Sequence, residues 1–138
     1  MIKEYTSLGL MSGTSGDGVD ASVLKSDGKK QYKVLLDRFF PYNKDLKDDI
    51  FRLRDYINRF SDLKKYLKEI NLLEEKITLF HAMMSGEILK EYDIDIVGFH
   101  GQTIYHNAKE KITRQLGDGK KLSRILKKNL VYNFRQND

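Results

Sequence analysis

The segment Leu10-Met11-Ser12-Gly13-Thr14-Ser15-Gly16-Asp17-Gly18-Val19-Asp20 contains three glycines, three hydroxyl side chains and two carboxylates. The glycines permit backbone angles closed to other residues and let an anion approach main-chain N–H groups. The segment is not a Walker A motif, because no Gly-Lys-Ser/Thr ending follows. It is not a Rossmann fingerprint either, because the next residues have the pattern of a strand. Two interpretations stay open from the residues alone: a phosphate-binding turn or an ordinary hairpin turn.

The residues around this turn have the pattern of β-strands. Residues 5–10 are mostly apolar, residues 18–25 form a second run, and residues 31–40 form a third after a turn at 26–29. Runs of this kind joined by Gly- and Ser-rich turns predict an antiparallel meander of three strands. Pro41 is the single proline of the chain, and we expect it to close the meander.

Helical periodicity follows the meander. Residues 45–58 have mixed periodicity with exposed charge, and the next segment has apolar residues at steps of three or four, as on one face of a helix. We expect this stripe to face the core, with a break near Asn71, and His81 beside it to be structural. The stripe consists of Leu63, Leu67, Ile70, Leu73, Ile77, Phe80, Met84 and Ile88.

A second polar segment, His100-Gly101-Gln102-Thr103, follows a buried strand. Ligands bind outside the carboxyl ends of the strands in open α/β sheets, so these groups suit a polyhydroxylated ligand. The alternative is a polar turn whose groups satisfy one another. Residues 111–116 have the pattern of a strand, 120–128 of a short helix and 130–134 of a last strand. Arg135 then follows, and an arginine at a strand end can form two hydrogen bonds to a carboxylate or phosphate.

This order of elements predicts one α/β domain over residues 1–138, with the first three strands antiparallel and the later ones parallel. The net charge is +5, but Lys and Arg alternate with Asp and Glu in the middle of the chain, which is typical of solvated helix faces. No nucleic-acid partner is therefore expected. The chain has no cysteine, so it has no disulfide or thiolate metal site, and no apolar run of about 20 residues suggests a membrane partner. A cytoplasmic location is the expectation.

Four segments together resemble those of the anhydro-N-acetylmuramic acid kinase family. Residues 9–20 are similar to that family's ATP-phosphate loop, and residues 99–103 to its His-Gly-Gln-Thr segment. Gln115-Leu116-Gly117-Asp118 resembles its Gln-Ile-Gly-Asp, and Asn133-Phe134-Arg135 its Asp-Phe-Arg. The order and approximate spacing of the segments agree over essentially the whole chain.

The resemblance implies an actin-like ATPase fold, in which two ribonuclease-H-like halves close over ATP. It implies a kinase that uses ATP to convert 1,6-anhydro-N-acetylmuramic acid to N-acetylmuramic acid 6-phosphate in peptidoglycan recycling. Asp17 and Asp20 would hold Mg²⁺. The residues implied for the ATP phosphates are Gly13, Thr14, Ser15, Gly16, Asp17, Gly18, Val19 and Asp20, and those implied for the amino sugar are His100, Gln102, Thr103 and Arg135.

Three departures from the family pattern qualify this expectation. Gly16 replaces a larger apolar residue, which would loosen the loop, and Asn133 replaces an aspartate near the sugar. Members of the family are more than twice this length, so the C-terminal domain, with the general base, is expected to be absent from these residues. The alternatives are an inactive remnant and a sugar- or nucleotide-binding module without turnover. The expected partner is a second copy or a separately encoded C-terminal half, docked on an exposed apolar face.

Overall fold

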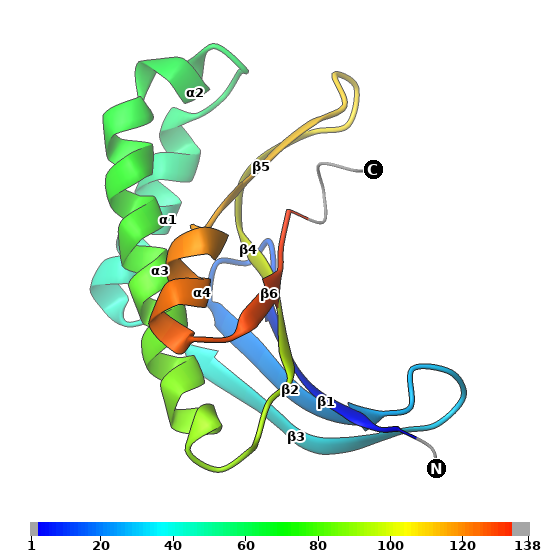
Figure 1. Ribbon diagram of the computed structural model, residues 1–138. Helices are drawn as coiled ribbons and strands as arrows, with labels where there is room; N and C mark the ends of the chain where they lie inside the picture. Colours follow the sequence, from blue (N-terminus) through cyan, green and yellow to red (C-terminus); the bar gives the residue numbers. More distant parts are fainter. Residues whose placement is uncertain (1–2, 134–138) are drawn as a thin grey trace.

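The computed structural model describes residues 3–133, which form a mixed sheet with helices on one face (Figure 1). The sheet has six strands in the order β3-β2-β1-β4-β5, with β6 also beside β4. The strands are β1 (Tyr5–Ser12), β2 (Gly18–Ser26), β3 (Tyr32–Pro41), β4 (Ile96–Asn107), β5 (Ile112–Leu116) and β6 (Asn129–Val131). The helices are α1 (Lys44–Tyr56), α2 (Asp62–Lys65), α3 (Leu67–Leu89) and α4 (Gly119–Leu126).

Strand directions confirm the predicted fold class, but the expectation that all the later strands are parallel was wrong for β5, which runs antiparallel to β4. β1, β2 and β3 form an antiparallel meander, while β4 runs parallel to β1 and β6 runs parallel to β4. β4 is long enough to take two partners along one edge. Its first half pairs with β6, and its second half pairs with β5 in an antiparallel hairpin.

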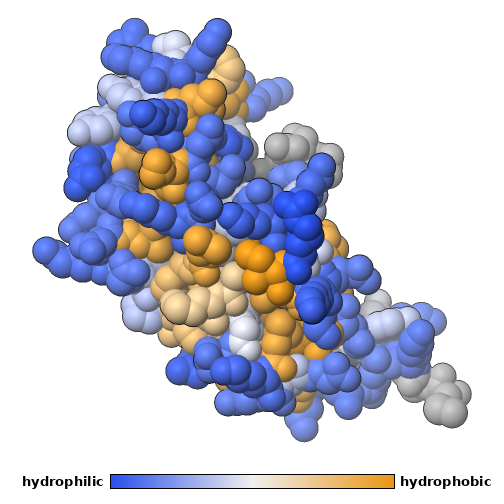
Figure 2. Space-filling view, turned by 60° about the vertical axis from the view of Figure 1, so that its left-hand side comes forward, coloured by the Kyte–Doolittle hydropathy of each residue, from blue (hydrophilic) through white to orange (hydrophobic). Residues whose placement is uncertain are grey.

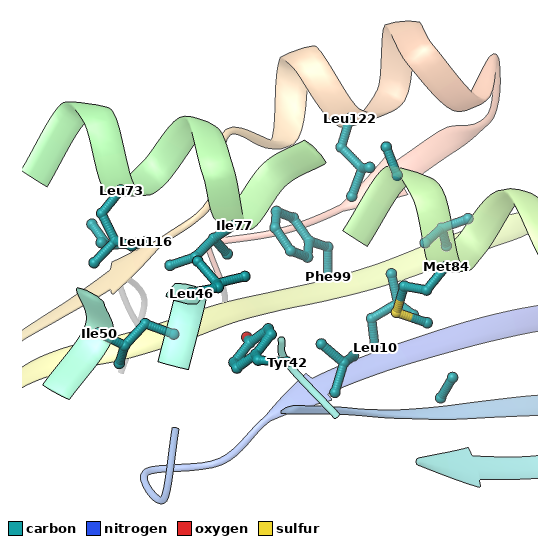
Figure 3. Close-up of a cluster of buried hydrophobic side chains, with 14 of the residues drawn as sticks. Leu10, Tyr42, Leu46, Ile50, Leu73, Ile77, Met84, Phe99, Leu116 and Leu122 are labelled. Carbon is teal, nitrogen blue, oxygen red and sulfur yellow. The ribbon is translucent and has the colours of Figure 1, made fainter. Parts of the chain in front are cut away.

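The core lies between the sheet and the helices (Figure 3). Alternate residues of β2 (Val19, Ala21 and Val23) are fully buried, whereas Asp20 between them is exposed. This period of two is what a half-buried strand requires. Leu10, Ile77 and Phe99 meet in the same cluster from β1, α3 and β4. Their burial supplies the apolar area that stabilises the fold.

The helical stripe is largely as predicted, with two differences. The break between helices falls at Tyr66, whose φ of −104° and ψ of 26° leave the helical region, and not near Asn71, which lies inside α3. Leu67 comes directly after this break and is half-exposed, whereas Ile70 in the same turn is buried.

The outer face of the helices is mostly charged, with apolar side chains between (Figure 2). Leu72, Leu79 and Met83 on α3 are each about half-exposed or more. Exposed apolar side chains were expected on one face, and α3 carries some of them. Within residues 3–133, no helix is both long enough and apolar enough to span a bilayer.

The second polar segment was expected after a buried strand, with a polar turn as the alternative; in the structure the segment lies inside β4. Leu10 pairs with Phe99 and Ser12 with Gln102, so β4 carries one residue more than β1 between these two pairs. This β-bulge contains Gly101, whose φ is +85°. β4 continues past it because β5 provides a new antiparallel partner. A bulge re-aims the following side chain, and here it turns Gln102 toward the helices.

Replacing Gly101 by alanine should destabilise the domain by at least about 1–2 kcal/mol, because the left-handed angle is costly for a residue with a Cβ. The added Cβ would also lie 2.7 Å from the carbonyl oxygen of Leu116. Urea unfolding of the variant measures this loss.

The matched control is Gly86→Ala. Gly86 lies in α3 with open space around it. Alanine there should raise the free energy of unfolding by about 0.4–1 kcal/mol. Equal effects of the two substitutions would show that the bulge does not require glycine.

Candidate phosphate-binding site

Residues 13–17 form the loop between β1 and β2, at the carboxyl end of β1 (Figure 1). Its turn is closed by the N–H of Gly16, which donates to the carbonyl of Gly13 at 3.3 Å. Gly13, Thr14 and Ser15 are exposed. Within residues 3–133, neither Thr14 nor Ser15 makes a hydrogen bond, so their N–H and hydroxyl groups are available to an anion. We name residues 13–17 the phosphate loop.

Gly16 packs the phosphate loop against α1. It is buried with φ of +69°, and a Cβ there would lie 3.2 Å from Nη1 of Arg54 and 3.3 Å from Ile50. The sequence had predicted that glycine at this position loosens the loop. The structure shows close contact, because the absent side chain lets the main chain approach the helix.

Asp17 and Asp20 lie on either side of the start of β2. The carboxylate of Asp17 forms an ion pair with Lys47 at 3.1 Å, with both side chains about half-exposed. Asp20 is exposed on β2. Within residues 3–133, no three His, Asp or Glu side chains gather as a metal site. Mg²⁺ is usually held by one or two carboxylates plus substrate phosphates, and Asp17 and Asp20 offer oxygen ligands of that kind.

The other predicted loop residues contribute structure. Gly18 pairs with Pro41 at the start of β2, and the Val19 side chain is fully buried in the core. Ser12 supplies one of the three hydroxyl groups of residues 10–20. It is fully buried, because the end of β1 lies beneath α3.

Four buried polar side chains connect the phosphate loop to β4 and α3. Gln102 Nε2 donates to the carbonyl oxygen of Gly13 at 2.8 Å and to that of Thr103 at 3.2 Å. The Tyr42 hydroxyl lies 3.1 Å from Gln102 Oε1 and 3.1 Å from Ser12 Oγ. Ser12 Oγ in turn lies 3.2 Å from His81 Nε2. We call Ser12, Tyr42, His81 and Gln102 the buried polar network.

His81 is the inner end of this network, in agreement with its predicted structural role. Its Nδ1 lies 2.8 Å from the carbonyl of Ile77, which can only accept, so Nδ1 carries a proton. In the neutral ring, Nε2 then accepts from Ser12. Complete burial against the Phe99 ring disfavours the imidazolium and lowers the pKa of His81 to about 4.

The remaining residues predicted for the sugar are separated by the strand pleat. His100 and Thr103 flank the bulge and are partly buried, while Gln102 between them points to the helices. Thr103 Oγ1 accepts from Gln115 Nε2 at 3.2 Å, and His100 Nδ1 lies 2.9 Å from the carbonyl of Gly101. Arg135 lies outside the described residues.

The segment Gln115-Leu116-Gly117-Asp118 anchors α4. The N–H of Gly117 donates to Glu74, the N–H of Asp118 donates to Thr78 Oγ1, and Asp118 caps α4 by accepting from the N–H of Lys121. These bonds attach the segment to α3.

Tyr42 is the site residue that the sequence did not reveal. Its partners Ser12 and Gln102 are 30 and 60 residues away, so no local pattern could mark it. The one available signal was its position, directly after the proline that ends β3.

A glycine-rich loop between the first two strands, in a mixed sheet with three antiparallel strands and a parallel continuation, is consistent with an actin-like ATPase fold of the ribonuclease-H-like class. The chain belongs to the anhydro-N-acetylmuramic acid kinase family, whose model matches residues 5–138.

Three curated relatives named anhydro-N-acetylmuramic acid kinase support the assignment. The chain is 59% identical over 140 residues to the protein of Pelagibacter ubique, 35% identical over 138 residues to that of Agrobacterium fabrum, and 33% identical over 138 residues to that of Rhizobium etli. These matches cover 100%, 96% and 96% of the chain. The chain spans 37% of the length of each relative.

The buried imidazole predicts a pH dependence of stability. A folded-state pKa of about 4, below the ordinary 6.5, means that the unfolded chain binds the proton more readily. The free energy of unfolding should therefore fall as pH drops from about 6.5 to 4, by up to about 3 kcal/mol from this group. Urea unfolding at several pH values measures the slope.

The variant His81→Gln should lose the fall in unfolding free energy that His81 contributes between pH 6.5 and about 4. The variant His106→Gln should retain it, because His106 is exposed on β4. The carboxyl groups of Asp27 and Asp62, whose pKa values are lowered by main-chain N–H donors, titrate in all three proteins and cancel in the comparison. Identical slopes in wild type and His81→Gln would contradict the assignment.

Proposed function

We propose that this chain forms the N-terminal domain of an ATP-dependent kinase that converts 1,6-anhydro-N-acetylmuramic acid to N-acetylmuramic acid 6-phosphate. The observation that carries the proposal is the phosphate loop itself. Thr14 and Ser15 keep their donors unpaired within residues 3–133, while the loop is held by Gln102 from one side and by α1 from the other. Fixed donors that need no reorganisation are the device by which phosphoryl transfer is stabilised.

In this proposal different residues of the loop bind the phosphates and the cation. The main-chain N–H and hydroxyl groups of Thr14 and Ser15 bind phosphate oxygens, and the glycines at positions 13, 16 and 18 allow the close approach. Asp17 and Asp20 hold Mg²⁺, which neutralises charge on the phosphates when bound. Lys47 keeps the Asp17 carboxylate in place through their ion pair.

The sugar would lie along the bulged part of β4. His100, Thr103 and Arg135 are proposed to bind it directly. Gln102 shares the segment, but both N–H groups of its amide are already engaged. We therefore propose that Gln102 serves the sugar site by holding Gly13, so that the phosphate and sugar sides keep a fixed separation. Near-attack positioning of this kind is a large part of catalysis.

The full reaction requires groups beyond the described residues. Because the chain spans 37% of the length of its relatives, we propose that the general base and the adenosine contacts come from a C-terminal half. A cytoplasmic setting would supply the ATP. The alternative function is a sugar- or nucleotide-binding module without turnover.

Calorimetric titration of the chain with Mg-ATP should detect binding through the phosphates and the cation, weaker than that of a kinase that also has the adenosine contacts. The variants Asp17→Asn and Asp20→Asn should each weaken it about tenfold, because each removes a carboxylate from the cation. The matched control is Asp93→Asn, whose exposed carboxylate lies just before β4, far in sequence from the loop. Failure of the wild-type chain to bind Mg-ATP would overturn the proposal.

The turnover assay separates the two functions. The chain is incubated with Mg-ATP and 1,6-anhydro-N-acetylmuramic acid, and the 6-phosphate sugar is measured. We expect product only when a C-terminal half is added. ATP binding with no product in its presence would support the binding module and contradict the kinase.

A further inference from the structure

We propose that Tyr42 is a positioning residue that sets the shape of the phosphate loop through Gln102. Its effect on nucleotide binding rests on the proposed function, but its effect on the loop does not. Tyr42 lies between β3 and α1 and belongs to none of the segments that resemble the family motifs. Figure 3 shows its ring within the core cluster, near Leu10 and Leu46.

The hydrogen-bond chemistry of Gln102 makes it depend on Tyr42. Both N–H groups of its amide are used, toward the carbonyl oxygens of Gly13 and Thr103. This fixes the orientation of the amide and leaves Oε1 facing the Tyr42 hydroxyl. Gln102 is fully buried, so no bulk water replaces that donor. Loss of the hydroxyl would leave Oε1 unpaired, at a cost typical of buried polar groups.

Counting the protons in the network shows that no other side chain in it can donate to Gln102 Oε1. Neutral His81 donates only to Ile77, so the Ser12 hydroxyl proton goes to His81 Nε2. The single proton of Tyr42 goes to one of Ser12 Oγ and Gln102 Oε1, which both lie 3.1 Å away. Within the network it is the one donor left for Oε1, because the Ser12 proton is already used and Oε1 carries no proton. Tyr42 therefore joins β1 to β4 directly beneath the loop.

Tyr42 also holds the other end of the loop. Its main-chain N–H donates to the carbonyl of Asp17 at 2.9 Å. Gly13 is thus held by the side chain through Gln102, and Asp17 is held by the main chain. One residue fixes both ends of the turn that presents Thr14 and Ser15.

The surroundings of Tyr42 keep it a fixed donor. It is 5% exposed, and the edge of the Phe80 ring packs against it with centroids 5.0 Å apart. Burial raises the pKa of Tyr42 to about 12, so the hydroxyl keeps its proton at any pH at which the domain is studied.

The test compares Tyr42→Phe with Tyr92→Phe in the full chain. Tyr92 is partly buried, and its hydroxyl donates to the carbonyl of Leu35 on β3, away from the network. Both variants lose one hydroxyl with its single donated proton, and both keep the aromatic ring. Circular dichroism and thermal unfolding are the controls that check whether each variant is folded.

The deciding readout needs no ligand. Proton–nitrogen NMR spectra should show the Gln102 side-chain NH₂ of the wild type shifted and protected from exchange. In Tyr42→Phe this signal and the N–H signals of Thr14, Ser15 and Gly16 should move, with at least tenfold faster exchange of the Gln102 amide. In Tyr92→Phe they should stay at their wild-type positions. Unchanged Gln102 and loop signals in Tyr42→Phe would overturn the proposal.

A double-mutant cycle on Mg-ATP affinity provides the second readout. Tyr42→Phe should weaken binding about three- to tenfold in the wild-type background and much less in a Gln102→Met background, because the path from Tyr42 to the loop is then already cut. Equal losses in both backgrounds would contradict action through Gln102. If the wild-type chain binds no Mg-ATP, the proposed function fails while the NMR comparison still decides the role of Tyr42.

Discussion

The side-chain amide of Gln102 donates to the carbonyl of Gly13 and so joins two segments that lie 89 residues apart in the sequence. Most of the site depends on this bond. It requires the bulge at Gly101, because a regular strand would turn the amide to the opposite face of the sheet. The bulge in turn requires a residue that accepts φ of +85° next to the Leu116 carbonyl.

The buried polar network is an exception within an apolar core. Unpaired polar groups are costly at such positions, and here each of the four side chains has partners. Among the described residues, the two buried side-chain atoms without a partner are Arg54 Nη1 and Ser85 Oγ. Arg54 Nη1 lies beneath Gly16. The loop therefore rests on a bonded polar support at Gly13 and on a packed helix at Gly16.

Local patterns in the sequence were enough to predict the meander, the parallel strands and the long helix. The glycines and hydroxyls of residues 12–18 marked the turn, and steps of three and four marked α3. The prediction that the buried strand ends before His100 was wrong. A glycine among polar residues is typical of a turn, but the pairing with β5 keeps this stretch in the sheet. The burial of Ser12 and the role of Tyr42 depend on contacts between distant segments, which local patterns do not contain. The sugar role of Arg135 stays a prediction.

We propose that a preformed loop, supported by Gln102, receives the phosphates of a nucleotide. The decisive experiment is a crystal structure of the chain with Mg²⁺ and a non-hydrolysable ATP analogue. Phosphate oxygens should lie within hydrogen-bond distance of the N–H groups of Thr14 and Ser15, with Gln102 Nε2 still bonded to Gly13. A nucleotide bound elsewhere, or a loop that breaks the Gln102–Gly13 bond to receive it, would show that the loop is not a preformed phosphate site.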